Sequence, residues 1–259
     1  MRLQLPLIHR GNRLAAVIIG AAVLVGFYQL PARLQFRPAM NLDQSFIDSW
    51  IPFLEWTIWF YASEYLLVIL AIWLAVSDLE RSRAFYALIL ASTIGLVIFT
   101  LWPTAVAPQS PKSLGLTGQL WRWLYTVDTS ANALPSLHAA NTCIAAVCIY
   151  RLGRAWRFIA PVWATSILVS TLTTKQHYVI DIVGGIALAV LCQVVVRAYL
   201  KFRLLEAMSL GDAPVKASMK WADRVVGAVL VSFGGALLVG ALLSVAQMFV
   251  GLLVVLWRD

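Results

Sequence analysis

Charged residues are scarce in this chain. Asp, Glu, Lys and Arg together make up 12% of its 259 residues, whereas soluble domains carry about 25%. Hydrophobic residues make up 61%, and they gather in runs long enough to cross about 30 Å of hydrocarbon as helices. This composition excludes an ordinary soluble domain. It predicts an all-α fold, a polytopic helical bundle embedded in a membrane.

Cysteine is also rare. The three cysteines, Cys143, Cys148 and Cys192, all lie inside apolar runs, which excludes a disulfide framework and predicts buried free thiols. No small-residue cleavage site follows the first apolar run after Arg13. We therefore interpret this run as a retained span rather than a signal peptide.

Six apolar runs are interpreted as the core of the bundle. They cover residues 14–30, 53–76, 84–101, 135–150, 156–173 and 178–199. A short interfacial helix is expected at 42–50. Residues 102–134 are rich in Pro, Gly, Ser and Thr, so they are expected to form a long loop.

These runs divide the chain into four parts. Residues 1–52 hold the first span and the interfacial segment, 53–200 the helical core, 201–224 a charged connector, and 225–259 a last apolar segment. The last segment is too long for one upright helix and too short for two full ones. One span with an interfacial tail and a hairpin bent near Gly234 both remain open.

The basic residues are divided unevenly between the two predicted sides of the membrane. Fourteen of the 20 Lys and Arg residues fall on one side: Arg2, Arg10, Arg13, Arg81, Arg83, Arg151, Arg154, Arg157, Arg197, Lys201, Arg203, Lys216, Lys220 and Arg224. Because cytoplasmic loops carry the excess of Lys and Arg, this side is predicted to be cytoplasmic. The basic residues of these loops account for the net charge of +8. Because such loops attract anionic lipid headgroups, no nucleic-acid partner is expected.

Histidine is as rare as cysteine, and two of the three histidines lie in polar motifs. The first motif is "NALPSLH" at 132–138, and the second is "TTKQHYVID" at 173–181. The alternation of spans places both motifs on the non-cytoplasmic side. Ionisable groups at membrane depth are costly, so they are candidates for function.

The second motif contains the parts of a nucleophile. His177 and Asp181 are spaced i and i+4, which places them on one face of a helix. A carboxylate on one imidazole nitrogen fixes the tautomer and makes the other nitrogen a better nucleophile.

The first motif contains the parts of a proton donor and an anion site. A helix is expected to begin at Pro135, with His138 in its first turn and suited to proton transfer. The Ser136 hydroxyl and the N–H groups of that turn, together with Lys175, offer donors to an anion. The set predicts phosphoryl transfer through a phosphohistidine. A metal site built from both histidines and an aspartate remains the alternative.

The two motifs resemble those of a known family. "PSLH" at 135–138 and "TKQHYVIDIVGG" at 174–185 are similar to the type 2 phosphatidic acid phosphatase (PAP2) superfamily. "WPTAVAP" at 102–108 resembles the Pro-rich element of its inositol phosphorylceramide synthase-like branch. The resemblance covers roughly residues 55–200. It implies a six-helix PAP2-like core made of the first span and the catalytic segment 53–200, with the last apolar segment as an addition. It also implies that no metal or other cofactor is needed.

The resemblance also implies roles for particular residues. His177 is expected to be the nucleophile and Asp181 its partner. His138 is expected to protonate the leaving oxygen, and Ser136 to bind phosphate. Ser170 stands where the third motif of the family begins with serine, which makes it a further substrate-binding candidate.

The chain departs from the phosphatases of this family at two points. It lacks their Lys-x6-Arg-Pro element, and Thr171 stands where the third motif usually has arginine. Lys175, with Lys112 and Arg122 from the long loop, is then expected to meet the charge of the phosphate. These departures are compatible with the transferase branch.

The predicted function is the cleavage or transfer of a phosphate ester on a lipid in the bilayer. Water as the acceptor makes the protein a lipid phosphatase, and an alcohol acceptor makes it a phosphotransferase. The expected location is a bacterial inner membrane, with the active site facing the periplasm or exterior. A transporter and a non-catalytic scaffold are the rival interpretations. The absence of paired, Gly/Pro-broken halves disfavours the first, and the complete set of His138, His177 and Asp181 disfavours the second.

One acidic residue lies in the middle of a predicted span. Glu64 falls inside the run 53–76, where a carboxyl group is costly. Two interpretations stay open: a carboxyl group paired or protonated in the bundle interior, and a contact to a headgroup or to a cation of the site.

Overall fold

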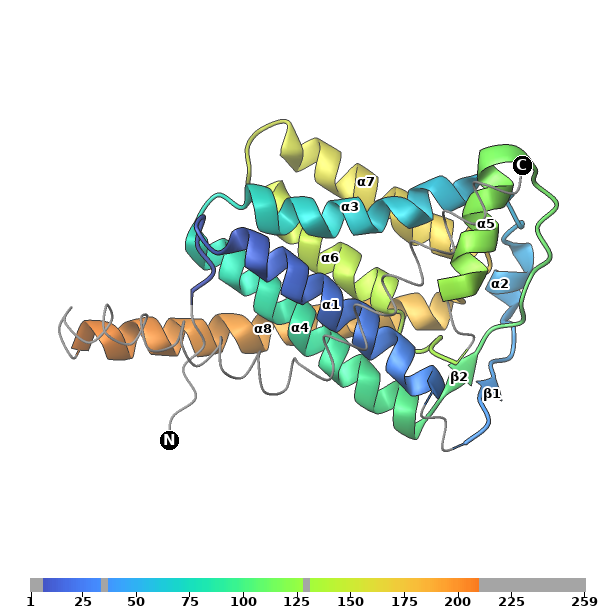
Figure 1. The fold of residues 1–259 in the computed structure, drawn as a ribbon, viewed down its shortest axis with the longest axis horizontal. Coiled ribbons are helices and arrows are strands. Elements are labelled where there is room, and N and C mark those ends of the chain that lie inside the picture. Colours follow the sequence, from blue (N-terminus) through green and yellow to red (C-terminus); the bar gives the residue numbers. More distant parts are fainter. Residues whose placement is uncertain (1–6, 34–36, 128–130, 210–259) are drawn as a thin grey trace.

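The computed structural model describes residues 7–33, 37–127 and 131–209, and within them it forms a bundle of helices (Figure 1). The helices are α1 (Arg13–Arg33), α2 (Phe46–Trp50), α3 (Ile58–Leu74), α4 (Asp78–Leu101), α5 (Gly115–Val127), α6 (Leu137–Tyr150), α7 (Trp156–Thr173) and α8 (Val179–Ser209). The all-α prediction is confirmed. The predicted apolar segment 225–259 and most of the connector 201–224 lie outside the described residues.

Two very short strands accompany the helices. β1 (Met40–Asn41) and β2 (Thr104–Ala105) pair in parallel, with Met40 opposite Thr104. The pair joins the chain after α1 to the chain after α4, at the end of the bundle that also holds α2 and α5 (Figure 1).

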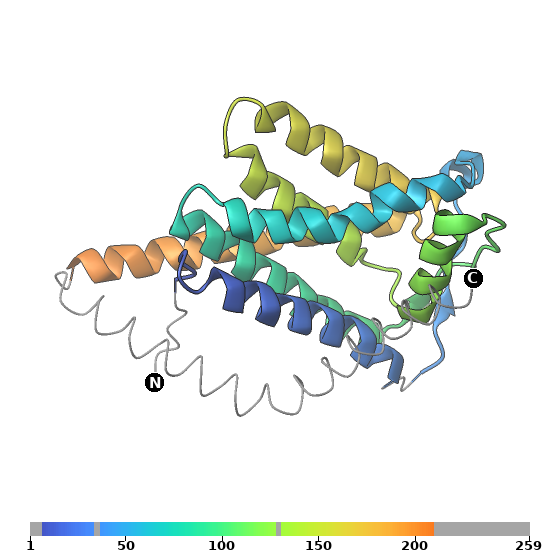
Figure 2. The ribbon, with the colours of Figure 1, turned by 45° about the horizontal axis from the view of Figure 1, so that its top comes forward.

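Within the described residues, three helices are long and apolar enough to cross a membrane. They are Glu55–Leu74, which adds the 3-10 turn η1 (Glu55–Thr57) to α3, then α4, and Val179–Lys201 within α8. The prediction of a polytopic membrane bundle therefore agrees with the described helices. In Figure 2, α3 and α8 run close to one direction, and α4 and α6 cross them obliquely.

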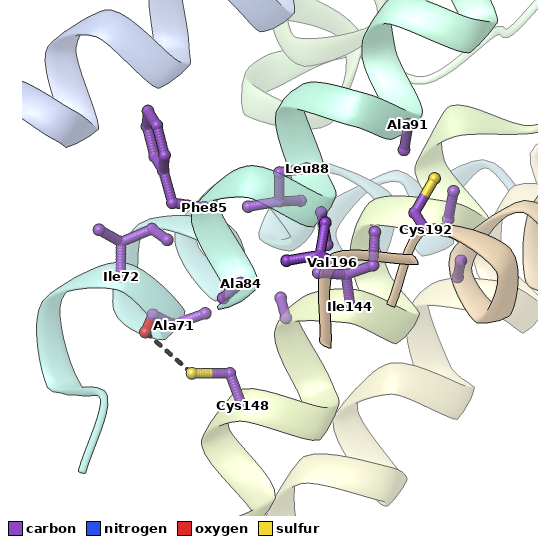
Figure 3. Close-up of a cluster of buried hydrophobic side chains, with 14 of the residues drawn as sticks. Ala71, Ile72, Ala84, Phe85, Leu88, Ala91, Ile144, Cys148, Cys192 and Val196 are labelled. Carbon is purple, nitrogen blue, oxygen red and sulfur yellow. Dashed lines mark hydrogen bonds between the residues drawn. The ribbon is translucent and has the colours of Figure 1, made fainter. Parts of the chain in front are cut away.

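Small side chains bring the central helices together. Ala71, Ala84 and Ala91 are almost fully buried, and they lie with Ile144 at the interfaces of α3, α4, α6 and α8 (Figure 3). The Cys148 thiol of α6 donates a hydrogen bond to the carbonyl oxygen of Ala71 at 3.3 Å. Because alanine allows backbones to approach closely, this pattern favours tight helix packing in a membrane.

The predicted free thiols are present. Cys148 and Cys192 are buried, whereas Cys143 is partly exposed, and all three are free. The expectation of full burial thus holds for two of the three residues.

A buried arginine closes the turn between α3 and α4. Arg81 is 1% exposed, and its guanidinium donates to the carbonyl oxygens of Ile72 at 2.9 Å and Ala75 at 3.2 Å. It also pairs with Asp78. An unpaired buried charge would cost about 3–5 kcal/mol, so these three partners account for the burial of Arg81.

Three predicted boundaries are wrong. The third span begins at Asp78 rather than residue 84, because Ser77 caps α4 and the polar first turn belongs to the helix. The expected loop 102–134 contains α5. The last helix continues to Ser209, nine residues into the predicted connector. Hydropathy alone cannot locate polar helical turns or an amphipathic helix, since neither forms an apolar run.

The two ends of the bundle differ in charge. At one end Arg151 at the end of α6 pairs with Glu80 of α4 at 2.9 Å, and the Arg13 guanidinium lies 3.9 Å from the Trp73 ring centroid. At the other end lie α2, α5, the strands and the starts of α3, α6 and α8 (Figure 1). The two polar motifs of the sequence lie at this second end.

Candidate active site

The start of α6 is recessed within the bundle. A Cβ atom added at Gly95 would lie 2.9 Å from Leu137, so the first turn of α6 packs against α4 six residues before α4 ends at Leu101. At a rise of 1.5 Å per residue, this point lies about 9 Å below the end of α4. The polar residues of α6 are therefore within the bundle rather than on its rim.

His177 lies beside Asp181, as the spacing predicts. The distance from His177 Nδ1 to Asp181 Oδ2 is 3.6 Å, and the Asp181 side chain is fully buried. His177 precedes α8 by two residues, so the pair is not formed within a helix. Asp181 instead reaches back from the first turn of α8, and its Oδ2 accepts the backbone N–H of Tyr178 at 2.8 Å. Asp181 thus caps α8 and faces His177 at once.

His138 has its own carboxylate. Its Nδ1 lies 2.5 Å from Oε2 of Glu64 in α3, and both side chains are almost fully buried. The Tyr61 ring stacks on His138 with 4.1 Å between ring centroids, and Tyr65 meets the imidazole edge-on at 6.0 Å. Glu64 is therefore paired inside the bundle, and its partner is a residue of the candidate site.

The two histidines face each other. Their ring centroids lie 6.1 Å apart, although His138 belongs to α6 and His177 to the turn between α7 and α8. In each imidazole the nitrogen nearest a carboxylate is Nδ1.

Gly185 allows α8 to approach the start of α6. A Cβ atom at Gly185 would lie 2.3 Å from the carbonyl oxygen of Ser136 and 2.8 Å from Cβ of Ala139. No larger residue fits without moving a helix. This approach lets the backbone N–H of Ser136 donate to the carbonyl oxygen of Asp181 at 3.0 Å, which links the two motifs directly.

Ser136 is the N-cap of α6. Its hydroxyl oxygen accepts the backbone N–H of Ala139 at 3.2 Å, and α6 begins at Leu137. The prediction that the helix begins at Pro135 is therefore wrong by two residues. Pro135 stands before the cap, after a cis peptide bond with Leu134. The hydroxyl proton of Ser136 is still available to an anion, since the cap uses only an oxygen lone pair.

Lys175 occupies a strained backbone position. Its φ is 55°, in the left-handed region that usually holds glycine after a helix end. Its ammonium donates to the carbonyl oxygen of Asp48 at 2.7 Å. Burial lowers the pKa of Lys175, and the Asp48 carboxylate opposes this shift. A lysine where glycine would be less strained indicates that the side chain itself is needed.

Asp48 holds the turn around His177 from outside. Its side chain is buried and accepts the backbone N–H of Val179 at 2.8 Å, while its main chain accepts Lys175. It also forms a capping box with Ser45, which starts α2. The sequence shows the signature of this cap, but it gives no sign that α2 lies against the start of α8.

The helix α5 covers the start of α3. Glu55 accepts the backbone N–H groups of Lys112 at 2.9 Å and Ser113 at 2.6 Å. Trp121 of α5 donates through its indole N–H to the carbonyl oxygen of Glu55 at 3.0 Å. Trp121 is buried in one cluster with Tyr61, whose ring stacks on His138. The helix α5, where a loop was expected, therefore supports Tyr61 beside His138.

The remaining substrate-binding candidates lie in different surroundings. The Ser170 hydroxyl donates to the carbonyl oxygen of Ile167 at 2.6 Å, so it must rotate before it can donate to a phosphate. Lys112 lies in the segment anchored to Glu55. Arg122 lies on α5, with Nη1 3.5 Å from the position of a Cβ atom at Gly118. The contacts described above bring His138, His177 and Asp181 together.

A metal site needs at least three converging ligand side chains. Among the described residues, no group of three or more His, Cys, Asp or Glu side chains is placed to hold a metal ion. Each histidine instead pairs with one carboxylate through Nδ1.

The fold and the site define a helical membrane protein with two carboxylate-paired histidines at one end of the bundle. A sequence model described as the PAP2 superfamily matches residues 25–195, about two thirds of the chain. The chain therefore belongs to the PAP2 superfamily and is a membrane enzyme of the phosphatase or phosphotransferase type. A comparison with curated proteins gave no match.

Proposed function

We propose that the protein transfers the phosphoryl group of a lipid phosphate ester through a phosphohistidine at His177. The observation that carries this proposal is the opposed pair of imidazoles, 6.1 Å apart, each with a carboxylate at Nδ1. One ring is suited to attack phosphorus, and the other to deliver a proton across the reacting group.

In the first half of the reaction, Nε2 of His177 attacks phosphorus. The N–P bond forms as the ester P–O bond breaks, and His138 gives its proton to the departing alcohol oxygen. The Asp181 carboxylate stabilises the positive charge that develops on the His177 ring. Because Asp181 is fully buried and held by the N–H of Tyr178, its position does not depend on the substrate.

In the second half, an acceptor hydroxyl attacks the phosphohistidine. His138 now takes the proton from the acceptor, a new P–O bond forms, and the N–P bond breaks to regenerate His177. Water gives inorganic phosphate, and an alcohol gives a new phosphate ester. The same two imidazoles serve both halves in opposite directions.

The phosphate charge needs donors near His177. Lys175 lies two residues away, and its ammonium has further N–H donors beyond the bond to Asp48. The Ser136 hydroxyl at the start of α6 supplies another donor, close to His138. The other candidates can bind phosphate only after a movement. The segment that carries Lys112, the helix that carries Arg122 or the hydroxyl of Ser170 must first turn toward the phosphate.

A lipid substrate fits the depth of the site. The start of α6 lies about 9 Å below the end of α4, and helices of membrane-spanning length surround it. A headgroup phosphate can reach such a position while its acyl chains remain in the bilayer. Thr171 in place of the arginine of the phosphatases favours the transferase branch, that of inositol phosphorylceramide synthase-like enzymes.

The choice between water and an alcohol is tested by the fate of the phosphoenzyme. Purified protein is mixed with a ³²P-labelled lipid phosphate in a single turnover, and acid-labile, base-stable label is measured on the chain. We expect polyols to speed the loss of this label and to yield a new ester. Decay at the same rate with and without every alcohol, to phosphate alone, would make the protein a phosphatase and exclude the transferase assignment.

The active site is proposed to face away from the cytoplasm, in a bacterial inner membrane, because the excess of Arg gathers at the opposite end of the bundle. Ser110 lies exposed near the site end, and Ala155 lies exposed at the basic end. In intact cells, we expect an impermeant maleimide to label Ser110→Cys, and Ala155→Cys only after permeabilisation.

The wild-type chain is the control for this labelling, because its three cysteines lie in apolar helices. The opposite pattern, with Ala155→Cys labelled from outside and Ser110→Cys protected, would invert the proposed orientation.

A further inference from the structure

Glu64 is a buried acidic residue that the motifs of the sequence do not explain. It lies on α3, it is 3% exposed, and its Oε2 stands 2.5 Å from Nδ1 of His138. A carboxylate at this depth in a membrane helix is costly. Its cost is offset only if its partner is charged or donates a strong hydrogen bond.

The two carboxylate–histidine pairs of the site are not equivalent. Asp181 Oδ2 stands 3.6 Å from His177 and already accepts the N–H of Tyr178. Glu64 Oε2 lies closer to its histidine, 2.5 Å from Nδ1 of His138. The closer carboxylate favours the positively charged ring more strongly. Pairs of titratable groups in unequal surroundings are how a site keeps one acid and one nucleophile at the same pH.

We propose that Glu64 is a positioning residue that keeps His138 protonated, so that His138 begins the reaction as its general acid. This inference rests on the proposed function and names the residue that sets the roles of the two histidines. Glu64 touches no reacting atom. Its carboxylate lies against Nδ1 of His138, which leaves the Nε2 side of the ring toward the leaving oxygen, and its charge stays beside the ring after the Nε2 proton has gone.

Other titratable groups surround His138, but none has the charge to replace Glu64. Tyr61 and Tyr65 from α3 present ring faces and edges to it. His177 from the α7–α8 turn faces it, and Asp181 of α8 lies against His177. The tyrosines are neutral at working pH, and the charge of Asp181 is directed to the other histidine. Glu64 is thus the carboxylate in contact with His138 among the described residues.

The test is the pH profile of Glu64→Gln with an alkyl phosphate substrate. Activity that needs a protonated acid falls as pH rises through the deprotonation of that acid. Glutamine keeps the shape and can still accept the Nδ1–H, but it removes the charge that favours protonated His138. We expect the alkaline limb to move to lower pH by about 1–3 units. Glu64→Asp keeps the charge and should move the limb in the same direction by less.

The leaving group provides a second readout. A nitrophenyl phosphate departs without a proton, so we expect Glu64→Gln to slow the alkyl ester at least tenfold more than the nitrophenyl ester. Glu206→Gln, the same change near the far end of α8, is the matched control and should leave both rates unchanged. Equal slowing of the two esters, with the alkaline limb of the pH profile unmoved, is the result of a damaged fold. This result would overturn the inference.

A double variant protects the test against loss of folding. Because Glu64 acts through His138, adding Glu64→Gln to His138→Ala should cost no further activity. A further tenfold loss, or an alkaline limb of Glu64→Gln and Glu64→Asp at the wild-type pH, would overturn the assignment. These outcomes are separate from the proposed function, which fails if the wild-type chain itself forms no phosphoenzyme on His177.

Discussion

Replacing His177 by alanine is expected to abolish both turnover and the phosphoenzyme. The proposed intermediate is an N–P bond at Nε2 of this ring, and alanine offers no nucleophile to form it. His138 cannot substitute for it, because its Nδ1 is engaged by Glu64 and its Nε2 is proposed to carry the proton of the general acid. The measurement is ³²P label retained on the protein after rapid quench, alongside turnover.

His9→Ala is the matched control for this variant. His9 is the third histidine of the chain, it lies before α1, and its Nδ1 accepts the backbone N–H of Gly11 at 3.0 Å. The same chemical change there should leave labelling intact. If His177→Ala retained activity while the wild-type chain never acquired label under single turnover, the covalent mechanism would be wrong.

Replacing Asp181 by asparagine is expected to reduce kcat by a factor on the order of 10³–10⁴, the loss seen when an orienting carboxylate is neutralised in a catalytic triad. Asparagine has the same shape, and its amide oxygen can still accept the N–H of Tyr178. It has no charge to stabilise the cationic His177 ring that forms during attack. The turn and α8 should therefore remain folded while the chemical step slows.

Asp43→Asn is the matched control for the aspartate. Asp43 is exposed, and its charge contributes to the raised pKa of Tyr178, for which burial is the largest cause. It therefore lies near the site without belonging to it, and its neutralisation should leave kcat within a factor of about two. Phosphoenzyme formation by Asp181→Asn at the wild-type rate would exclude Asp181 as the partner of the nucleophile.

The rates of His177→Ala and Asp181→Asn are expected to depend differently on the leaving group of the substrate. Loss of His177 removes the acceptor of the phosphoryl group, so every leaving group should fail equally. Loss of the Asp181 charge raises the barrier to forming the cationic ring, so a better leaving group should recover part of the rate. This difference separates the nucleophile from the residue that supports it.

The main residues of the candidate site could be identified in the sequence because they are rare. Two of three histidines and one of twelve acidic residues lie in motifs at the ends of apolar runs, and apolar surroundings make such groups conspicuous. Alternation of spans then places the motifs at one end of the bundle. The close contact of the motifs could not be predicted, since it depends on Gly185 meeting the carbonyl of Ser136, a contact between helices that are separate in the sequence.

The partners of these residues required the tertiary structure. The sequence shows Glu64 inside an apolar run, where a carboxyl group is costly. Only the packing of α3 against α6 shows that it lies next to His138. Asp48 carries a local capping pattern, and only the fold shows that it also holds Val179 and Lys175.

The sequence by itself determined the class of protein, the approximate spans and the residues with chemical potential, because hydrophobic runs and isolated polar groups are local properties of the chain. The tertiary structure decided which carboxylate serves which histidine, where α5 lies, and how deep the site is. These depend on contacts between segments up to about a hundred residues apart, and such contacts follow from how helices pack rather than from the composition of any one of them.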